Sequence, residues 1–458
     1  MMDKTAATEA KIDRSKLQSC LVRQRELFAR EHLRSAELFE QARSSMLSGV
    51  PMNWMVKWAG DFPLFVREAG GAHFIDVDGH EYIDLCLGDT GAMTGHAPPA
   101  AVEAIVERVR HGTTFMLPTE DSIWVAQELS RRFGLPFWQV ALTATDANRF
   151  AIRLARQITG RKLILIFNWC YHGTVDETFI TLEGGIAGVR RGNLGPAVDP
   201  TETTRVVEFN DISALEAALK DGAVACVLAE PAMTNIGIVQ PEPGFHQALR
   251  DITRRTGTLL ILDETHTICA GPGGCTQAWG LQPDMLTLGK PIASGIPAAV
   301  YGFSRDVAGR IAQAMSVGDS DTSGIGGTLA GNALSIAAMK ATLEHVLTEP
   351  AYERMIALAS RFTEGVQSVI QEKHLPWIVK QLGCRAEYWF SSEPPLNGGQ
   401  AAAAVDSDLD CYMHLSALNA GILITPFHNM ALISPATSEA DIDRHSQVFR
   451  ESVEAILG

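Results

Sequence analysis

The segment from 138 to 304 alternates short apolar runs with helical patterns, and this alternation constrains the fold more than any other feature. Apolar runs predict six strands, at 140–142, 163–168, 224–229, 259–262, 285–288 and 298–303. Helical patterns lie between several of them, around 147–158, 212–220 and 244–256. Strands that alternate with helices usually pair in parallel, so the pattern predicts an α/β fold with a mostly parallel, doubly wound sheet.

Two of these apolar runs end in residues that can carry chemistry. Leu259–Leu262 leads into Asp263, and Met285–Leu288 leads into Gly289 and Lys290. Open α/β sheets bind ligands at the carboxyl ends of their strands, so a carboxylate and an amine are predicted at one sheet edge. A buried lysine loses its proton more readily and can form a Schiff base with a carbonyl compound. The alternative is that Asp263 caps a helix and Lys290 lies on the surface.

Three further segments suit a phosphorylated aromatic cofactor. At Thr143–Ala147 a strand meets a helix through small and hydroxylated residues, which leaves the first amides of the helix free to bind a phosphate. Gly327-Thr328 is a second such junction, and Tyr171 follows a strand. Taken singly, a helix cap, a plain turn and a core aromatic are the simpler explanations. Together with Asp263 and Lys290, they offer partners for the phosphate, ring face, ring nitrogen and aldehyde of pyridoxal 5′-phosphate (PLP).

In these motifs the sequence resembles the class III PLP-dependent aminotransferases, a fold type I group, and within them the glutamate-1-semialdehyde aminomutase-like branch. The resemblance covers roughly residues 35–450. Six segments carry it in the expected order: Thr143–Arg156, Tyr171–Gly173, Glu230-Pro231 with Asn235–Gly237, Asp263-Glu264, Gly289-Lys290 and Gly327–Asn332. The resemblance implies a fold type I transferase that uses PLP, with a smaller α+β domain formed by both ends of the chain.

The resemblance also assigns roles around the cofactor ring. Lys290 would hold the cofactor aldehyde as a Schiff base and then move a proton during catalysis. Asp263 would pair with the pyridine nitrogen and keep it protonated. Tyr171 would stack on the ring, His172 beside it would also contact the cofactor, and Glu230 matches a family glutamate that lies close to it.

At the phosphate end the resemblance implies two groups of residues. The backbone amides of Ala144 and Thr145, with the Thr145 hydroxyl, would bind the phosphate. Thr328 resembles the residue that reaches the phosphate of the neighbouring subunit's cofactor. The active unit is therefore expected to be a homodimer, or a dimer of dimers, with shared active sites.

Three segments depart from the family pattern. The usual Ser-Gly-Thr-Glu-Ala is replaced by Thr143–Ala147, which removes the backbone freedom of one glycine. Thr265 places a hydroxyl where an apolar contact to the ring is expected. The substrate stretch of the aminomutases, of the Gly-Val-Asn-Ser-Pro type, is replaced by Gly49–Met55. The last change argues against glutamate 1-semialdehyde as the substrate.

The predicted function is that of an aminotransferase, which moves an amino group from an amine or amino acid to a keto acid such as pyruvate. Apolar residues in segments that border the pocket favour an apolar or aromatic donor: Trp54, Trp58, Phe115, Met116 and Trp169. Arg385 is a candidate for binding the carboxylate of the acceptor. Alternatively, Arg385 is a strand arginine that pairs with Glu387 or with solvent.

Two other functional classes remain open. One is an intramolecular aminomutase, like glutamate-1-semialdehyde 2,1-aminomutase, or a racemase, and neither needs a second substrate. The other is a binding or assembly protein that keeps the fold without the chemistry. The presence of both Lys290 and Asp263 counts against the second class.

Changes in composition divide the chain into four predicted regions. These are an N-terminal helical arm at 1–48, the N-terminal part of the small domain at 49–95, a large PLP-binding domain at 96–335, and the C-terminal part of the small domain at 336–458. The arm should form two helices, and either its own domain or a second subunit can cover their apolar face.

Charge and cysteine content narrow the choice of partners and compartment. With 38 basic and 53 acidic residues the net charge is −15, which argues against a nucleic-acid partner. No uncharged apolar run reaches the length of a membrane span, and the N-terminus lacks the apolar core of a signal peptide. Eight scattered cysteines without a CxxC pair, and histidines without a metal-binding motif, predict a cytoplasmic protein without a bound metal.

Overall fold

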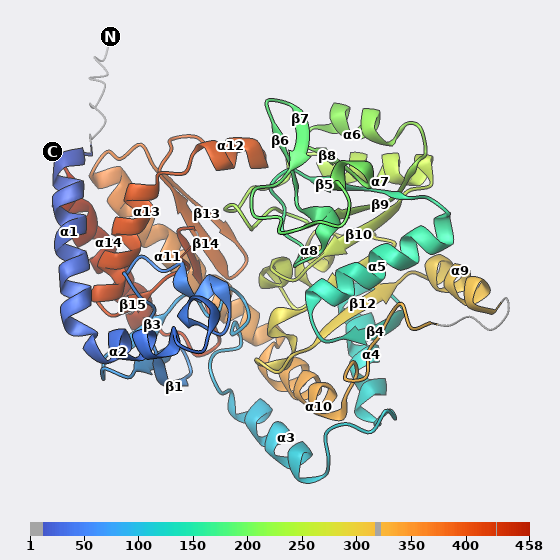
Figure 1. The fold of residues 1–458 in the computed structure, drawn as a ribbon, viewed down its shortest axis with the longest axis horizontal. Helices are drawn as coiled ribbons and strands as arrows, with labels where there is room; N and C mark the ends of the chain where they lie inside the picture. The colour runs from blue at the N-terminus through green and yellow to red at the C-terminus, as the bar shows by residue number, and fades with distance from the viewer. Residues whose placement is uncertain (1–11, 317–321, 427) are drawn as a thin grey trace.

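The structure, a computed structural model, describes residues 12–316, 322–426 and 428–458. Two groups of elements lie side by side in Figure 1. The middle of the chain, coloured green to yellow, surrounds one large sheet, whereas the blue N-terminal and red C-terminal elements share a smaller α+β domain. The predicted α/β fold, with a small domain built from both chain ends, is confirmed.

Seven strands form the central sheet of the large domain. They are β4 (Phe137–Ala141), β5 (Leu163–Phe167), β8 (Thr204–Val207), β9 (Val224–Ala229), β10 (Leu259–Asp263), β11 (Met285–Leu288) and β12 (Ala299–Phe303). Their spatial order is β4-β12-β11-β10-β9-β5-β8. Strand β12 runs antiparallel to both of its neighbours, and the other pairs in the sheet are parallel.

Helices cover both faces of this sheet. Helix α5 (Ala144–Thr159) packs on one face, and α6 (Ile212–Leu219) and α7 (Phe245–Thr256) pack together on the other. Neighbouring residues of β9 enter different cores, since Leu228 joins the α5 side and Val227 the α6–α7 side. Burial on both faces explains why these strands are continuous apolar runs rather than alternating ones.

The large domain has further elements around this sheet. They are α3 (Pro99–Arg110), α4 (Asp121–Phe133), α8 (Gly274–Ala278), α9 (Arg305–Ser316), α10 (Ala333–Ala341) and a hairpin of β6 (Ile180–Glu183) and β7 (Ile186–Val189). The sequence pattern predicted six of the seven sheet strands but not β8, and it did not predict the β6–β7 hairpin. Helix α5 also starts at Ala144, three residues before the predicted start at 147.

In the part of the chain that the structure describes, two small sheets and six α-helices form the small domain. One sheet holds β1 (Val66–Gly70), β2 (His73–Asp76), β3 (Glu81–Asp84) and β15 (Ile422–Leu423), and the other holds β13 (Ile378–Leu382), β14 (Arg385–Trp389) and β16 (Met430–Leu432). The helices are α1 (Arg14–Glu31), α2 (Leu33–Ala42), α11 (Glu349–Glu372), α12 (Gly398–Ala403), α13 (Ser407–Asn419) and α14 (Glu439–Ile456). Strands β1, β2 and β3 form an antiparallel meander, and β15 extends it in parallel to β3.

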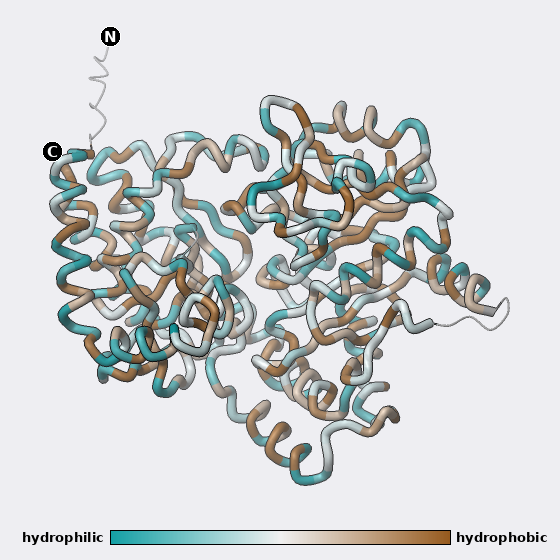
Figure 2. The backbone as a smooth tube through the Cα atoms, in the orientation of Figure 1, coloured by the Kyte–Doolittle hydropathy of each residue, from teal (hydrophilic) through white to brown (hydrophobic). Residues whose placement is uncertain are grey.

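Helix α1 packs on the C-terminal helices α13 and α14 of the same chain (Figure 1). In Figure 2 it alternates hydrophilic and hydrophobic segments, and its apolar residues Leu17, Leu21 and Phe28 are buried in the shared core. Helix α1 therefore covers its own domain, which is one of the two alternatives considered above. The region boundaries at 48, 95 and 335 stay a prediction.

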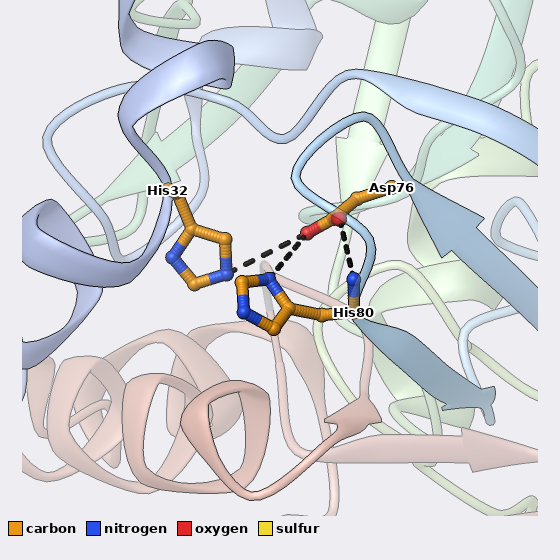
Figure 3. A group of neighbouring side chains, drawn as sticks. All are labelled: His32, Asp76 and His80. Atoms are coloured by element: carbon orange, nitrogen blue, oxygen red, sulfur yellow. Dashed lines mark hydrogen bonds and ion pairs between the residues drawn. The ribbon is translucent and has the colours of Figure 1, made fainter.

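A buried polar group ties the N-terminal helices to the β2–β3 hairpin (Figure 3). We call His32, Asp76, His80 and Tyr82 the anchor cluster. His32 Nδ1 donates to the Phe28 carbonyl over 2.7 Å, and its Nε2 lies 2.7 Å from the Tyr82 hydroxyl. Asp76 accepts from the His80 backbone amide over 2.9 Å, from His80 Nδ1 over 3.2 Å and from Tyr82 over 3.1 Å.

Three members of the anchor cluster have the residue types of a metal site. His32, Asp76 and His80 offer ligand atoms within 4.8 Å of one another, and within the described ranges they are the one such group of three. Hydrogen bonds inside the protein already engage these atoms, so we interpret the cluster as a structural link between two segments. The absence of a bound metal stays a prediction.

Within the described ranges, we find no helix with the length and apolarity needed to cross a membrane. All eight cysteines are free thiols. Cytoplasmic localisation stays a prediction.

Candidate active site

A cavity of about 480 Å³ opens at the carboxyl ends of β10 and β11. Six of the residues predicted to bind the cofactor line it: Ala144, Thr145, Tyr171, Glu230, Asp263 and Lys290. These residues come from segments that are up to 146 positions apart (290 − 144) but that end at the same edge of the sheet. The parallel order of the strands therefore brings them together, as expected for a sheet of this type.

Asp263, the last residue of β10, is held by donors from three directions. Its Oδ2 accepts from His172 Nδ1 over 2.9 Å and from Asn148 Nδ2 over 2.8 Å, and its Oδ1 accepts from the Thr265 amide over 3.1 Å. A carboxylate can accept about four hydrogen bonds, so one position remains on a side chain that lines the cavity. His172 thus contacts the carboxylate beneath the cavity and is not itself among the lining residues.

The pairing with His172 keeps Asp263 ionised. Burial alone would raise the pKa of Asp263, but the hydrogen bond from His172, its charge, and the Thr265 and Asn148 donors lower the pKa to about 2. Burial also opposes a charge on His172, but interactions with Cys170 and Asp263 hold the pKa of His172 well above its usual range. A charged pair in this position can keep a ring nitrogen protonated.

The start of α5 forms an anion-binding end to the cavity. The Thr143 side chain caps the helix by accepting from the Asp146 amide over 3.1 Å, so the amides of Ala144 and Thr145 are the unpaired groups of the first turn. Two glycines keep this end open. A Cβ added to Gly289 would lie 3.2 Å from the Ala144 nitrogen, and one added to Gly173 would lie 2.1 Å from Thr145 Oγ1.

Aromatic residues lie on one side of the cavity. Tyr171 lines it, and the ring centroid of Tyr171 lies 5.2 Å from that of Trp54. Of the donor-binding candidates, Trp54 thus packs against Tyr171, and Trp58 is half-buried. Neither tryptophan is among the described residues that line the cavity, and the same holds for Phe115, Met116 and Trp169.

The amine of Lys290 points toward two polar residues rather than into open solvent. Lys290 Nζ lies 2.8 Å from the Asp89 carbonyl oxygen, 2.9 Å from Asp89 Oδ2 and 2.8 Å from His266 Nε2. Lys290 itself has a φ of 51°, a left-handed conformation that is strained for a residue with a side chain. Such strain often accompanies a functional site and is a second indication that this lysine is placed for chemistry.

Arg385 is fully buried behind His266. Its Nη1 lies 3.0 Å from His266 Nδ1, and its Nη2 contacts the Thr234 carbonyl over 3.4 Å and Asp89 Oδ1 over 3.8 Å. The alternative pairing with Glu387 or with solvent is wrong, since Glu387 pairs with His428 instead. Arg385 is not among the described residues lining the cavity, so its role in binding a carboxylate stays a prediction.

Glu230 and Thr328 occupy opposite environments. Glu230 lines the cavity, accepts a hydrogen bond from the Thr234 hydroxyl, and has its pKa raised by burial to about 7. Thr328 is exposed and is not among the residues that line the cavity of its own subunit. A role for Thr328 at the site therefore requires a second subunit.

Three polar residues of the site had no role in the sequence interpretation: Asp89, Asn148 and His266. Asn148 donates to Asp263, and Asp89 and His266 contact Lys290. Asp89 lies in the glycine-rich segment 88–96, and His266 lies three residues after Asp263. Their positions were visible in the sequence, but their contacts depend on pairings between distant segments.

The residues around the cavity fit PLP at each of its functional groups. Unpaired helix amides suit the phosphate, Tyr171 suits the ring face, Asp263 has a free acceptor position for the ring nitrogen, and Lys290 suits the aldehyde. The space that Gly173 and Gly289 leave beside Ala144 and Thr145 would be filled by any side chain. The geometry therefore supports the cofactor that the motifs predicted.

Comparisons with known proteins agree with this geometry. The family model for class III aminotransferases matches residues 54–451. A glutamate-1-semialdehyde 2,1-aminomutase from Sorangium cellulosum is 34% identical over 430 residues, which cover 92% of this chain and 96% of the relative. The enzyme of the same name from Anaeromyxobacter dehalogenans is 31% identical over 417 residues, covering 90% and 95% of the two chains.

Solved structures are similar over nearly the whole chain. A glutamate-1-semialdehyde-aminomutase from Pseudomonas aeruginosa PAO1 shares 48% identity, with a TM-score of 0.95 and coverage of 97% of this chain and 100% of that one. An omega-transaminase from Sphaerobacter thermophilus shares 27% identity, with a TM-score of 0.84 and coverage of 92% and 97%. The chain therefore belongs to the class III aminotransferases, and its cofactor is pyridoxal 5′-phosphate.

Proposed function

We propose that the protein is an aminomutase, which moves an amino group between two carbons of one small substrate. The observation that carries this proposal is the similarity, over at least 90% of the chain, to proteins named glutamate-1-semialdehyde 2,1-aminomutase. This was the alternative, rather than the first choice, of the sequence interpretation. A cavity of about 480 Å³ suits a cofactor together with a small substrate.

Lys290 is the residue that acts on the reacting atoms in this proposal. When bound, PLP supplies a ring that withdraws electrons and so stabilises negative charge on the carbon next to the amino group. Lys290 would hold the cofactor, and its amine, once freed, would move the proton between the substrate carbon and the cofactor's C4′. Asp89 and His266 contact the lysine nitrogen and would place it beside the cavity.

The other site residues prepare the cofactor for this chemistry. Asp263, charged and paired with His172, keeps a proton on the ring nitrogen. Asn148 fixes the orientation of Asp263, and Thr287 in turn donates to Asn148 over 2.6 Å. The amides of Ala144 and Thr145 bind the phosphate, and the Tyr171 ring limits the space above the cofactor.

An aminotransferase with a separate keto-acid acceptor is the second candidate. Two observations favour it: Gly49–Met55 replaces the substrate stretch of the aminomutases, and Trp54 from that segment packs against Tyr171. The 27% identity to an omega-transaminase is compatible with the same reading. An aromatic residue at this position would favour a larger, more apolar donor than a semialdehyde.

A single experiment separates the two candidates. Purified enzyme loaded with its cofactor is given glutamate 1-semialdehyde without any keto acid, and a second sample is given a panel of amino donors with pyruvate. An aminomutase forms the isomer in which the amino group has moved from carbon 2 to carbon 1, in many turnovers and with no acceptor. Turnover only in the second sample would reject the aminomutase proposal and support an aminotransferase.

We further propose that the active unit is a homodimer in which Thr328 of each subunit binds the cofactor phosphate of the other. Its exposure and its distance from the cavity of its own subunit support this arrangement. Replacing Thr328 with Val should weaken cofactor binding without changing the fold. A monomer by light scattering, active at the same concentration, would contradict the proposal.

A further inference from the structure

Arg385 belongs to the small domain, but its side chain contacts residues around the cavity. It lies at the start of β14 and is fully buried. Its Nη1 lies 3.0 Å from His266 Nδ1 and 3.5 Å from Thr90 Oγ1. Its Nη2 lies 3.4 Å from the Thr234 carbonyl oxygen and 3.8 Å from Asp89 Oδ1. One buried guanidinium therefore joins three segments that are distant in the sequence.

Two of these four neighbours also contact Lys290, each through its other polar atom. Asp89 faces Arg385 with Oδ1 and Lys290 with Oδ2, which lies 2.9 Å from Nζ. His266 faces Arg385 with Nδ1 and Lys290 with Nε2, which lies 2.8 Å from Nζ. Arg385 therefore contacts both side chains that contact the lysine nitrogen.

The segment that carries Asp89 has a backbone conformation that needs such support. Leu87, Asp89 and Thr90 have φ of 46°, 48° and 81°, in the left-handed region that is unfavourable for residues with a side chain. Such a conformation persists only where the surrounding structure fixes it. Arg385 contacts Asp89 and Thr90, so without Arg385 the segment can relax and the carboxylate can move away from Lys290.

The contacts of Arg385 leave it poorly placed to bind the carboxylate of a substrate. A guanidinium binds a carboxylate best through two neighbouring donors that face it. Both terminal nitrogens of Arg385 already face atoms of the protein. Its Nε lacks a partner within the described chain, but a single N–H group cannot form the paired bonds. The side chain is also not among the described residues that line the cavity.

We propose that Arg385 is a positioning residue, which holds Asp89 and His266 against Lys290 and does not bind the carboxylate of a substrate. The inference rests on the role proposed for Lys290. Arg385 lies on β14 of the small domain, whereas Lys290 follows β11 of the large domain. The placement of the lysine nitrogen therefore depends on how the two domains pack.

The test measures how fast the cofactor-free, full-length protein combines with PLP at one fixed pH, followed by the absorbance of the Schiff base. No substrate is present, so a residue that only binds a substrate carboxylate has no effect on this rate. Borohydride reduction and mass spectrometry identify the modified lysine. Circular dichroism checks the fold of each variant, and the rate is expressed per folded molecule.

The variants separate the placement of the neighbours from charge and from burial. Arg385→Lys keeps the positive charge but loses the forked donors. Thr90→Val changes no charge and removes a hydroxyl that lies 3.5 Å from Arg385 Nη1 and 3.0 Å from His266 Nδ1. The matched control is Arg132→Lys, because Arg132 is also buried but donates to main-chain carbonyls such as that of Leu347.

We expect Arg385→Lys to slow the reaction with PLP by about tenfold and Thr90→Val by about threefold, since a misplaced reacting group can lose up to about 100-fold. Arg132→Lys should lower the melting temperature but keep the rate within about twofold of wild type. In the double variant of Arg385 and Thr90, the combined loss should be smaller than the product of the single losses, because both residues act on the same neighbours.

The inference is overturned if Arg385→Lys combines with PLP as fast as wild type, or if Arg132→Lys is slowed as much as Arg385→Lys. If Arg385→Lys does not fold, a wild-type rate for Thr90→Val overturns it instead. Any of these results with the label on Lys290 would leave the proposed role of this lysine intact. A label on a different lysine would reject that role and the proposed function with it.

Discussion

One buried carboxylate lies in the anchor cluster and another lies at the cavity. Both have histidine neighbours, but the two places differ in whether every buried polar atom around the carboxylate has a hydrogen-bond partner. In the anchor cluster, each buried polar atom of His32, Asp76 and Tyr82 has a hydrogen-bond partner. Around the cavity, buried polar atoms without a partner include Asp89 Oδ1, His172 Nε2, Thr265 Oγ1 and Arg385 Nε. Residue type is similar in the two places, but the buried atoms that lack a partner lie around the cavity and at other sites of the described chain, and not in the buried part of the anchor cluster.

This difference should separate stability from activity. A buried polar group without a partner costs about 1–3 kcal/mol, so the active site lowers the free energy of unfolding until its ligand is bound. The anchor cluster has no such deficit and should stabilise the fold. Substitutions in the two places should therefore change different measurements.

The largest effect is expected from Lys290→Ala. Without the amine, the cofactor cannot be held covalently and the proton cannot be moved, so turnover should fall by more than about 10³-fold. The melting temperature of the cofactor-free protein should change little, since Lys290 is partly exposed. The control is Lys340→Ala, which removes a lysine that pairs with Asp121 away from the cavity. Equal losses of turnover in both variants would refute the catalytic role proposed for Lys290.

The second prediction concerns Asp76→Ala in the anchor cluster. Removing an acceptor of three hydrogen bonds leaves buried donors unpaired, so the free energy of unfolding in urea should fall by about 3 kcal/mol. Turnover per folded molecule of this variant should stay within about twofold of wild type. The control is Asp61→Ala, at an exposed position, and it should change the free energy of unfolding by less than about 0.5 kcal/mol. If the fully folded Asp76→Ala variant lost turnover, the anchor cluster would affect activity as well as stability, and the prediction would be wrong.

The third prediction uses the pH dependence of stability at Glu230. Burial raises the pKa of Glu230 to about 7, so the folded state holds a proton that the unfolded state releases near its ordinary pKa of about 4.3. Stability contributed by the neutral form is therefore lost as pH rises from about 4.3 through 7. Glu230→Gln should be more stable than wild type by about 3 kcal/mol at pH 8, and about equal at pH 4.5.

Urea unfolding of the cofactor-free protein at both pH values measures this difference. Glu353→Gln, at an exposed position, serves as the control and should show no dependence on pH beyond that of wild type. If Glu230→Gln were less stable than wild type at pH 8, the carboxylate would be acting as a needed partner rather than as a buried charge.

The smallest effect is expected from metal ions. If the anchor cluster is a hydrogen-bonded link, adding Zn²⁺ or a chelator should shift the melting temperature by less than about 1 °C. Calorimetry of the metal-treated protein checks this, with His80→Ala as the comparison. A stabilisation by Zn²⁺ that His80→Ala removes would show that the cluster is a metal site instead.

The apolar patterns were sufficient to predict most of the large sheet, and the exceptions have physical reasons. Burial on both faces makes β5, β9, β10 and β11 continuous apolar runs. Strand β8 contains Thr204 and Arg205, so it lacks such a run. The antiparallel direction of β12 is set by its pairing with β4 and β11, and an apolar run carries no information on strand direction.

At the site, residues at strand ends could be predicted, and residues brought in by other segments could not. Asp263 and Lys290 follow directly from the strand pattern. Asp89 reaches Lys290 from 201 positions away, and Arg385 reaches His266 from 119 positions away on a strand of the small domain. Short-range patterns do not contain these contacts, because they depend on how the two domains pack.

The packing of α1 on α13 and α14 has a consequence for how the chain is made. The ribosome delivers α1 first, yet its apolar face is covered by helices that begin at Ser407 and end at Ile456. At typical elongation rates the intervening segment takes roughly 20 to 80 s to synthesise. During that interval α1 lacks the two helices that cover it, so the nascent chain should depend on chaperones until translation is nearly complete.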